Sequence, residues 1–361
     1  MQVFGASVSY FTGKLEAYLR YKGIPYERLA IYAHEDEIRR ELGALQHPVV
    51  RLDDGRWMSD TTPMIAWLES QQPEPAVMPV DPAVRFLALL IEDYADEWLW
   101  RPAMHYRWSY EPDREILSRL ITDDQLRSVW YPRFVKLRLV KLRQRIGFVV
   151  RDGVNRRTRA HVEGGYHAAL SSMSAMLAER PFLLGETPSI ADFGLMGPML
   201  RHFGQDPTPA EIMRNEAPAV FEWVARMWNA RAAGTAPCFV DAFPADGAAL
   251  LREIAETHLV QLAANAEAVG CGKRRFAMTV QGCAYTALPV SAYRVACLAQ
   301  LRAAFAALPD AAQTEVRGQL DRPEAEVLWK PMALPDSGHD PEGRAPFGRG
   351  SNVYAGGVPL R

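Results

Sequence analysis

The stretch VVRLDDGRWM at residues 49–58, followed by DTTPMIAWLE at residues 60–69, decides how the first part of the chain folds. Two short apolar runs flank an Asp-Asp-Gly sequence that ends at Gly55. Glycine tolerates the positive φ that a tight turn between antiparallel strands requires. Pro63 lies in the first turn of the second stretch, where its missing N–H removes no helical hydrogen bond. The sequence therefore predicts a β-hairpin followed by a helix.

Alternating elements precede this hairpin. Residues 2–7 and 26–31 are typical of short strands, and residues 12–22 and 34–42 show helical spacing. The first of these helices ends at Gly23, with a proline two residues later, which is a normal stop. The first part of the chain is thus expected to run β-α-β-α-β-β-α.

Downstream of this unit, a linker holds Pro73, Pro75, Pro79 and Pro82. After it the chain shows only helical patterns up to residue 232, which predicts an all-α domain. Alanine-rich helical patterns return at about 246–268 and 291–320, and the tail from residue 331 is rich in Pro and Gly and expected to be irregular. The expected units are a first domain over residues 1–72, a helical domain over 83–232 and a mostly helical extension over 235–361.

Composition excludes several classes of function. The 361 residues are 48% apolar with a net charge of -2, so a sizeable core is expected and no basic balance favours nucleic acid. Residues 131–160 hold ten Arg or Lys against one acid, a pattern typical of a solvated helix face or of a surface that attracts an anion. No apolar run approaches the ~18 residues of a membrane span, and the start MQVFGASVSY is unlike a signal peptide. A cytoplasmic protein without membrane or nucleic-acid partners is expected.

Common catalytic and metal motifs are missing from the sequence. The cysteines form no Cys-x-x-Cys pair or metal spacing, which fits a reducing compartment; they are Cys238, Cys271, Cys283 and Cys297. His161 and His167 are six residues apart and do not share a helix face, so no metal site is expected. Neither a nucleophile elbow, a phosphate-binding loop nor a dinucleotide fingerprint is present.

Two features of the first domain are candidates for a functional site. Ser9 stands at the end of the first predicted strand, fourteen residues before Gly23 in KGIPYE. His47-Pro48 stands immediately before the hairpin.

Two further features complete the pattern. Asp60-Thr61 begins the third predicted helix, twelve residues after the proline that precedes the hairpin. LLGETPSIADF at residues 183–193 places Ser189 and Asp192 at the spacing of a capping box, in which each side chain bonds to the backbone of the other residue. We assign this last pair to folding and not to chemistry.

In their order and spacing, these four features resemble the glutathione S-transferase family over roughly residues 1–232. The resemblance implies a thioredoxin-like α/β glutathione-binding domain followed by an all-helical domain. It also implies glutathione as co-substrate, a small hydrophobic electrophile as second substrate, a homodimer and no metal. The extension over residues 235–361 goes beyond the usual family length.

The resemblance gives roles to the residues before and after the hairpin. His47-Pro48 matches the family's cis-proline, whose preceding backbone pairs with the peptide ligand; the alternative is a trans proline at a strand start. Histidine replaces the usual aliphatic residue, and its side chain either lines the site or faces solvent. Asp60 is placed to pair with the γ-glutamyl ammonium and Thr61 with the γ-glutamyl carboxylate at a helix N-terminus. The alternative is that these two residues only cap the helix.

Ser9 is the predicted catalytic residue, because the serine and cysteine classes of the family keep theirs at this position. A hydroxyl donating a hydrogen bond beside a helix N-terminus stabilises a thiolate, the reactive form of a thiol with a free pKa near ~8.5. The alternatives are that Ser9 only caps the helix, or that the neighbouring Tyr10 is the donor, as in other classes of the family. Either enzyme activity or a non-catalytic binding or scaffold role remains consistent with the sequence.

The aromatic segment over residues 92–108 is a candidate wall for the hydrophobic substrate. Trp100, Met104 and Trp108 recur every four residues and share a helix face. In the family the corresponding helix lines the pocket of the hydrophobic co-substrate. The alternatives are plain core or a dimer interface.

Overall fold

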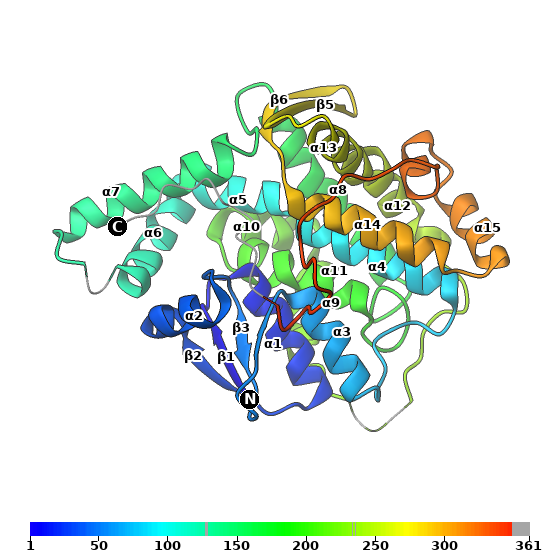
Figure 1. Ribbon diagram of the computed structural model, residues 1–361, viewed down its shortest axis with the longest axis horizontal. Helices are drawn as coiled ribbons and strands as arrows, with labels where there is room; N and C mark the ends of the chain where they lie inside the picture. Colours follow the sequence, from blue (N-terminus) through cyan, green and yellow to red (C-terminus); the bar gives the residue numbers. More distant parts are fainter. Residues whose placement is uncertain (127–128, 233, 235, 349–361) are drawn as a thin grey trace.

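The structure is a computed structural model of the 361-residue chain, and it describes residues 1–126, 129–232, 234 and 236–348. A small sheet with its helices forms the first domain, beside a larger body of helices (Figure 1). Helices α6 and α7 project from that body as an arm (Figure 1). Within the described part of the chain, no helix is both long and apolar enough to cross a membrane.

The first domain has the predicted β-α-β-α-β-β-α order. Its elements are β1 (Gln2–Gly5), α1 (Tyr10–Lys22), β2 (Glu27–Ala30), η1 (Ile31–His34), α2 (Glu35–Leu42), β3 (Val49–Arg51), β4 (Trp57–Ser59) and α3 (Thr61–Gln71). The strands lie in the order β2-β1-β3-β4, with β1 parallel to β2 and antiparallel to β3, and with β3 antiparallel to β4.

Two glycines end elements of this domain in the left-handed conformation. Gly23 follows α1 with φ 67°, and its N–H bonds to carbonyls of the last helical turn. Gly55 turns the predicted hairpin with φ 87°, and its N–H donates to the carbonyl of Leu52 at 3.0 Å. A side chain at either position would strain the backbone, so the turn signals of the sequence have a steric cause.

The second domain is helical, as predicted. Its helices are α4 (Pro82–Glu97), α5 (Trp100–Ser109), α6 (Glu111–Gln125), α7 (Arg133–Gln144) with the π-helical η2 (Arg145–Val150), α8 (Arg159–Leu177), α9 (Ile190–Pro198) with the π-helical η3 (Met199–Phe203), α10 (Pro207–Glu216) and α11 (Pro218–Asn229). The predicted capping box begins α9: the Ser189 N–H donates to the Asp192 carboxylate at 2.9 Å. That carboxylate also accepts the N–H of Leu183 and the indole N–H of Trp223. Asp192 therefore joins two helices and the preceding loop.

The extension contains helices and one hairpin. Its elements are η4 (Ala245–Gly247), α12 (Ala248–Glu253), η5 (Ile254–Leu259), α13 (Val260–Gly270), β5 (Arg275–Val280), β6 (Cys283–Pro289), α14 (Ala292–Ala306), α15 (Asp310–Gln319) and η6 (Pro323–Leu328). The β5–β6 hairpin was not predicted. Gln281 and Gly282 both have positive φ at its turn, and β5 alternates exposed and buried residues, the pattern of a half-buried strand.

The extension packs on the helical domain. Leu250, Leu251, Ile254 and Leu259 are buried and belong to the same core as the first two domains. Helix α14 lies along α4, and the chain after η6 returns across the molecule to α3 (Figure 1). The extension is thus built into the body of the protein.

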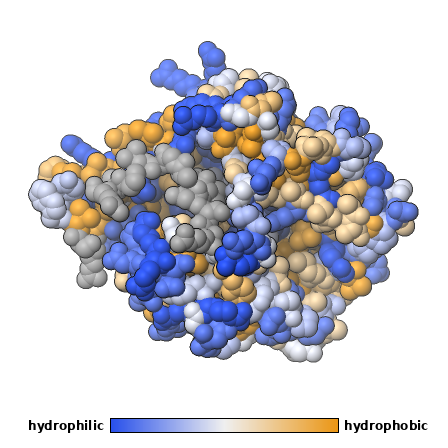
Figure 2. Space-filling view, viewed as in Figure 1, coloured by the Kyte–Doolittle hydropathy of each residue, from blue (hydrophilic) through white to orange (hydrophobic). Residues whose placement is uncertain are grey.

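The arm carries an exposed apolar stripe. Leu142, Ile146 and Val150 recur every four residues along α7 and η2, and Phe134 and Trp130 precede them on the same arm. More than half of each of these side chains is accessible to solvent. Figure 2 shows apolar surface along this arm.

Candidate functional site

Three loops meet at one end of the sheet in the first domain. The register pairs Phe4 of β1 with Val49 of β3, and Val49 with Ser59 of β4. Because β3 is antiparallel to both strands, the loop after β1, the loop before β3 and the turn after β4 all leave the sheet at this end. These three segments carry the predicted site residues Ser9, His47, Pro48, Asp60 and Thr61.

Ser9 precedes α1 in an extended conformation, and its side chain is half-buried. Its Oγ accepts the backbone N–H of Thr12 at 3.3 Å, so Ser9 caps the helix. This contact uses a lone pair of the hydroxyl and leaves its hydrogen available for donation. The capping role and the donor role proposed for Ser9 are therefore compatible.

The peptide bond between His47 and Pro48 is cis, the form that the resemblance implies. The His47 imidazole turns toward η1, where its Nε2 and the hydroxyl of Tyr32 lie 3.0 Å apart. Burial lowers the pKa of His47 to about 4, so the ring is neutral at physiological pH. Its side chain is thus bonded to Tyr32 within the first domain.

Asp60 comes directly before α3 with φ 72°, in the region that favours glycine. Its side chain makes no capping hydrogen bond to α3. Instead, Oδ2 accepts the hydroxyl of Tyr293, on α14 of the extension, at 2.9 Å. Burial raises the pKa of Asp60, and the hydrogen bond from Tyr293 opposes this rise. The next residue, Thr61, is buried and begins α3, where unbonded N–H groups give a partial positive charge.

Two family models match the chain. The N-terminal domain of glutathione S-transferases matches residues 3–76, and their C-terminal domain matches residues 155–226. Over these two regions the chain belongs to the glutathione S-transferase family. No curated protein matches it in sequence.

Solved structures that match the chain include three bacterial proteins. A glutathione S-transferase from Rhodospirillum rubrum F11 is 16% identical, with a TM-score of 0.43, over 62% of this chain and 86% of that one. The beta-etherase LigF from Sphingobium sp. strain SYK-6 is 18% identical, with a TM-score of 0.44, over 63% of this chain and 93% of that one. A glutathione S-transferase from Methylobacterium radiotolerans, in complex with glutathione sulfonate, is 18% identical, with a TM-score of 0.39, over 63% and 89%.

Tyr10, the alternative donor, points away from the converging loops of this transferase-family domain. Its ring is buried, and its hydroxyl donates to the carbonyl of Ala95 on α4. The ring also packs edge-on against Trp100 and His202 of the helical domain. The environment of Tyr10 is thus that of a core residue between the two domains.

Arg107 of α5 supports the loop that carries Ser9, and sequence reasoning missed it. Its buried guanidinium donates to the carbonyl of Val8 at 2.7 Å, to the carbonyl of Arg201 at 2.6 Å and to both oxygens of Asp206 at 2.7 and 2.9 Å. A planar guanidinium presents donors in a fixed fork, so these bonds hold the Val8 carbonyl in place relative to α5. The only indication of this role in the sequence was an arginine within an aromatic helical segment.

The predicted wall for a hydrophobic substrate is only partly accessible. Met104 and Trp108 are buried, which favours the core alternative for both. Trp100 is half-buried, and it stacks on Phe11 of α1 with ring centroids 6.0 Å apart. Phe148 of η2 packs edge-on against the same indole at 6.0 Å. Trp100 is therefore the member of the set that lies at an aromatic boundary between the domains.

A buried charge cluster joins the two transferase domains. Lys14 of α1 binds the carboxylates of Glu92 and Asp96 on α4, and its Nζ lies 3.3 Å from the hydroxyl of Thr62 on α3. Burial alone lowers the pKa of Lys14, but the two carboxylates raise it overall, so the amine is charged. In the sequence, this cluster was indicated only by two acidic residues, Glu92 and Asp96, four positions apart in an apolar helix. Buried charges need such partners, and the cluster fixes α3 against the helical domain.

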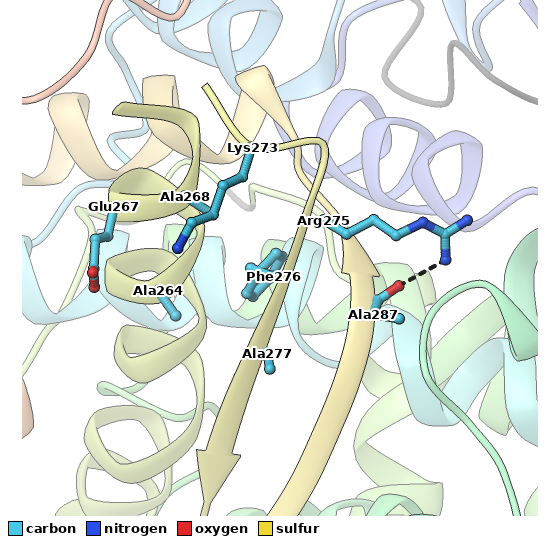
Figure 3. A pocket seen from close by; sticks show the side chains of 8 residues that line it. All are labelled: Ala264, Glu267, Ala268, Lys273, Arg275, Phe276, Ala277 and Ala287. Atoms are coloured by element: carbon cyan, nitrogen blue, oxygen red, sulfur yellow. Dashed lines mark hydrogen bonds between the residues drawn. The ribbon is translucent and has the colours of Figure 1, made fainter. Parts of the chain in front are cut away.

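A separate hollow of about 350 Å³ lies between α13 and the β5–β6 hairpin. Figure 3 shows Glu267, Lys273 and Arg275 around it, with alanines and Phe276 forming the rest of the lining. Arg275 donates to the carbonyl of Ala287 at 3.2 Å, as drawn in Figure 3. Among the described residues, no group of three or more His, Cys, Asp or Glu is arranged to hold a metal ion.

Proposed function

We propose that this chain is a glutathione-dependent transferase whose site lies where the three loops of the first domain converge. Family membership supports the substrate class. The observation that carries the proposal is that the loops holding Ser9, cis-Pro48 and Asp60 all leave the sheet at one end. Each of these groups complements a different part of a γ-glutamyl tripeptide thiol.

The γ-glutamyl end of glutathione is proposed to bind at the start of α3. Its carboxylate is attracted by the N–H groups and the hydroxyl at Thr61, and its ammonium pairs with Asp60. Because burial raises the pKa of Asp60, this carboxyl needs help to stay ionised. The hydroxyl of Tyr293 supplies part of that help, and a bound ammonium would supply more. The central backbone of the tripeptide would pair with the chain at His47 as an added strand.

Ser9 is proposed to stabilise the thiolate of bound glutathione. The thiol loses its proton to solvent, the Ser9 hydroxyl donates a hydrogen bond to the sulfur, and the sulfur forms a bond to an electrophilic carbon. Conjugation, or cleavage in which the bond to an ether oxygen or halide breaks, follows from the same attack. The aromatic boundary at Trp100 and Phe11 is the proposed resting place of a hydrophobic electrophile.

A non-catalytic binding role is the second candidate. The observation that favours it over catalysis is the position of the chain after η6, which lies against Ser59 and Asp60, leaves a space of only about 20 Å³ there and so restricts the repeated entry and exit of substrate that turnover requires. Isothermal titration with glutathione and S-hexyl-glutathione, together with a conjugation assay, separates the two. Tight binding without turnover of any electrophile would favour the binding protein.

Asp60→Ala tests the proposed ligand site directly. Loss of a hydrogen-bonded charge partner should weaken glutathione binding by about 1.5–3 kcal/mol. Asp36→Ala is the matched control, because it removes an exposed carboxylate from α2 of the same domain. Equal affinity in the Asp60 variant and the wild type would remove Asp60 from the site.

We also propose that the protein forms a homodimer. The stripe of Phe134, Leu142, Ile146 and Val150 on the arm supports this, because an isologous contact brings equivalent apolar faces together. Light scattering should give twice the chain mass for the wild type, and Leu142→Glu should shift it toward the monomer. A monomer at all concentrations would end this proposal.

A further inference from the structure

Residues 336–348 return from the extension to the first domain, and we call them the closing segment. The chain runs from the end of η6 to the region of α3 in Figure 1, and residues 336–348 form the last part of this path. At the first domain, the carbonyl of Pro346 accepts the backbone N–H of Ser59 at 2.9 Å. β4 is the edge strand of the sheet, so the closing segment bonds to its outer side at its last residue.

Side chains anchor the closing segment on both sides of this bond. Phe347 packs edge-on against Trp67 of α3 with ring centroids 5.2 Å apart, and the Arg56 guanidinium lies 4.5 Å from the centre of its ring. His339 packs edge-on against Tyr293 at 5.0 Å. The hydroxyl of that tyrosine is the group bonded to Asp60. The closing segment therefore lies against the residues proposed to bind the γ-glutamyl end.

The closing segment is a folded turn. Asp340 has φ 44°, and its carboxylate accepts the N–H groups of Arg344 and Ala345 at 2.8 and 2.9 Å. Pro346 is buried, although the five residues before it are exposed. A turn closed by its own hydrogen bonds can leave and return to the first domain without refolding.

The closing segment leaves too little room for glutathione. Gln46, Ser59 and Asp60 face His339, Pro346 and three other residues of the closing segment across a space of about 20 Å³. That volume suits about one water molecule. Pockets for small ligands measure roughly 300–1,000 Å³. At this end of the sheet, the protein's own chain fills the position that the γ-glutamyl group would take.

We propose that the closing segment is a reversible internal cover of the glutathione site, which glutathione must displace in order to bind. This inference rests on the proposed function. The attachments of the cover include a backbone hydrogen bond, two aromatic contacts and the Arg56 guanidinium on the Phe347 ring. Its turn is exposed and lacks helix and strand, features of the parts of a fold that open most easily. Apparent affinity then falls with the fraction of molecules in which the cover is closed.

Phe347→Ala in the full-length chain tests the cover. Removing the ring that lies between Trp67 and Arg56 should open the site more often and tighten apparent glutathione binding by about five- to tenfold. Phe221→Ala is the matched control, because Phe221 is an exposed ring on α11 with the Arg214 guanidinium 5.7 Å from its centre. Isothermal titration of the three proteins measures the change.

Trypsin cleavage provides a second readout. The side chain of Arg344 is 61% exposed in the turn, and cutting after it reports the freedom of the closing segment. Saturating glutathione should speed this cut, as followed by mass spectrometry. The cover is overturned if Phe347→Ala binds glutathione equally or more weakly, or if glutathione protects the bond after Arg344. If neither Phe347→Ala nor the wild type binds glutathione, the proposed function is wrong. The proposal of a cover over the glutathione site is then wrong as well.

Discussion

Replacing Arg107 with methionine should destabilise the fold strongly, because it leaves the Asp206 carboxylate buried without its partner. The Arg107 side chain makes two hydrogen bonds to that carboxylate and two to backbone carbonyls, at 2.6–2.9 Å. Breaking a buried ion pair from one side costs about 3–5 kcal/mol, since the remaining charge keeps its desolvation penalty. Urea denaturation followed by tryptophan fluorescence measures the change in the free energy of unfolding.

A double-mutant cycle isolates the pair. Asp206→Asn alone leaves the guanidinium short of an anion, whereas the double variant Arg107→Met, Asp206→Asn removes both charges. If the ion pair causes the loss, the double variant should be less destabilised than the sum of the single changes, by an interaction energy of up to about 3 kcal/mol. Simple additivity would contradict the ion-pair explanation.

The effect of Arg107→Met should also depend on pH. Burial raises the pKa of Asp206 from 3.8 to about 6. The charge of Asp113 adds to this rise, and Arg107 opposes it. A carboxyl with a raised folded-state pKa binds its proton more tightly in the folded state, so its contribution to stability falls as pH rises from 3.8 toward 6. Without Arg107 the pKa of Asp206 rises further, so the stability of the variant continues to fall as the pH rises above 6. The cost of Arg107→Met should therefore be larger near neutral pH than in acid, and a cost below about 1 kcal/mol at neutral pH would refute the reasoning.

Three further predictions concern the site. Tyr293→Phe removes the hydrogen-bond donor that favours ionised Asp60. On acidification, glutathione binding measured by calorimetry should therefore be lost at a higher pH in this variant than in the wild type. The control Tyr166→Phe removes a buried hydroxyl elsewhere and should leave that pH unchanged. Because the pKa of His47 is lowered to about 4, glutathione affinity should show no titration of this ring between about pH 6 and about pH 8, and a His47→Gln variant that changed the profile there would contradict this. Trp100→Ala should lower kcat/KM for a hydrophobic electrophile and leave glutathione affinity unchanged, whereas an equal loss of both would place the indole in the glutathione site.

Local signals were sufficient for the order of elements in the first domain. The glycines at 23 and 55 end a helix and turn a hairpin because their backbones adopt positive φ. The site candidates Ser9 and Asp60 followed from the family resemblance, and both stand directly before a helix in the structure. The cis form before Pro48 followed from family resemblance alone.

Contacts between residues far apart in the sequence could not be predicted. Arg107 lies 99 positions from both Val8 and Asp206, and Tyr293 lies 233 positions from Asp60. Neither spacing leaves a periodic pattern. The side-chain direction of His47 was equally open, because only the fold brings Tyr32 beside it.

The extension contains one hairpin that the sequence did not predict. The β5–β6 hairpin turns at Gln281-Gly282, a weaker turn signal than Asn-Gly or Asp-Gly. The tail was expected to be irregular because it is rich in Pro and Gly, and it does lack helix and strand up to residue 348. Composition says nothing about where an irregular segment lies, and this one is bonded to the first domain through Pro346.

An ultraviolet titration of the thiolate of bound glutathione measures whether Ser9 stabilises it. A charge-assisted hydrogen bond contributes about 1.5–3 kcal/mol, and one pKa unit corresponds to about 1.36 kcal/mol. Ser9→Ala should therefore raise the pKa of the bound thiol by about one to two units, whereas Ser7→Ala, an exposed serine in the same loop, and Tyr10→Phe should leave it unchanged. A shift of the thiol pKa in Tyr10→Phe without one in Ser9→Ala would move the catalytic role to Tyr10. If glutathione bound to the wild type forms no thiolate near neutral pH, neither residue activates the thiol.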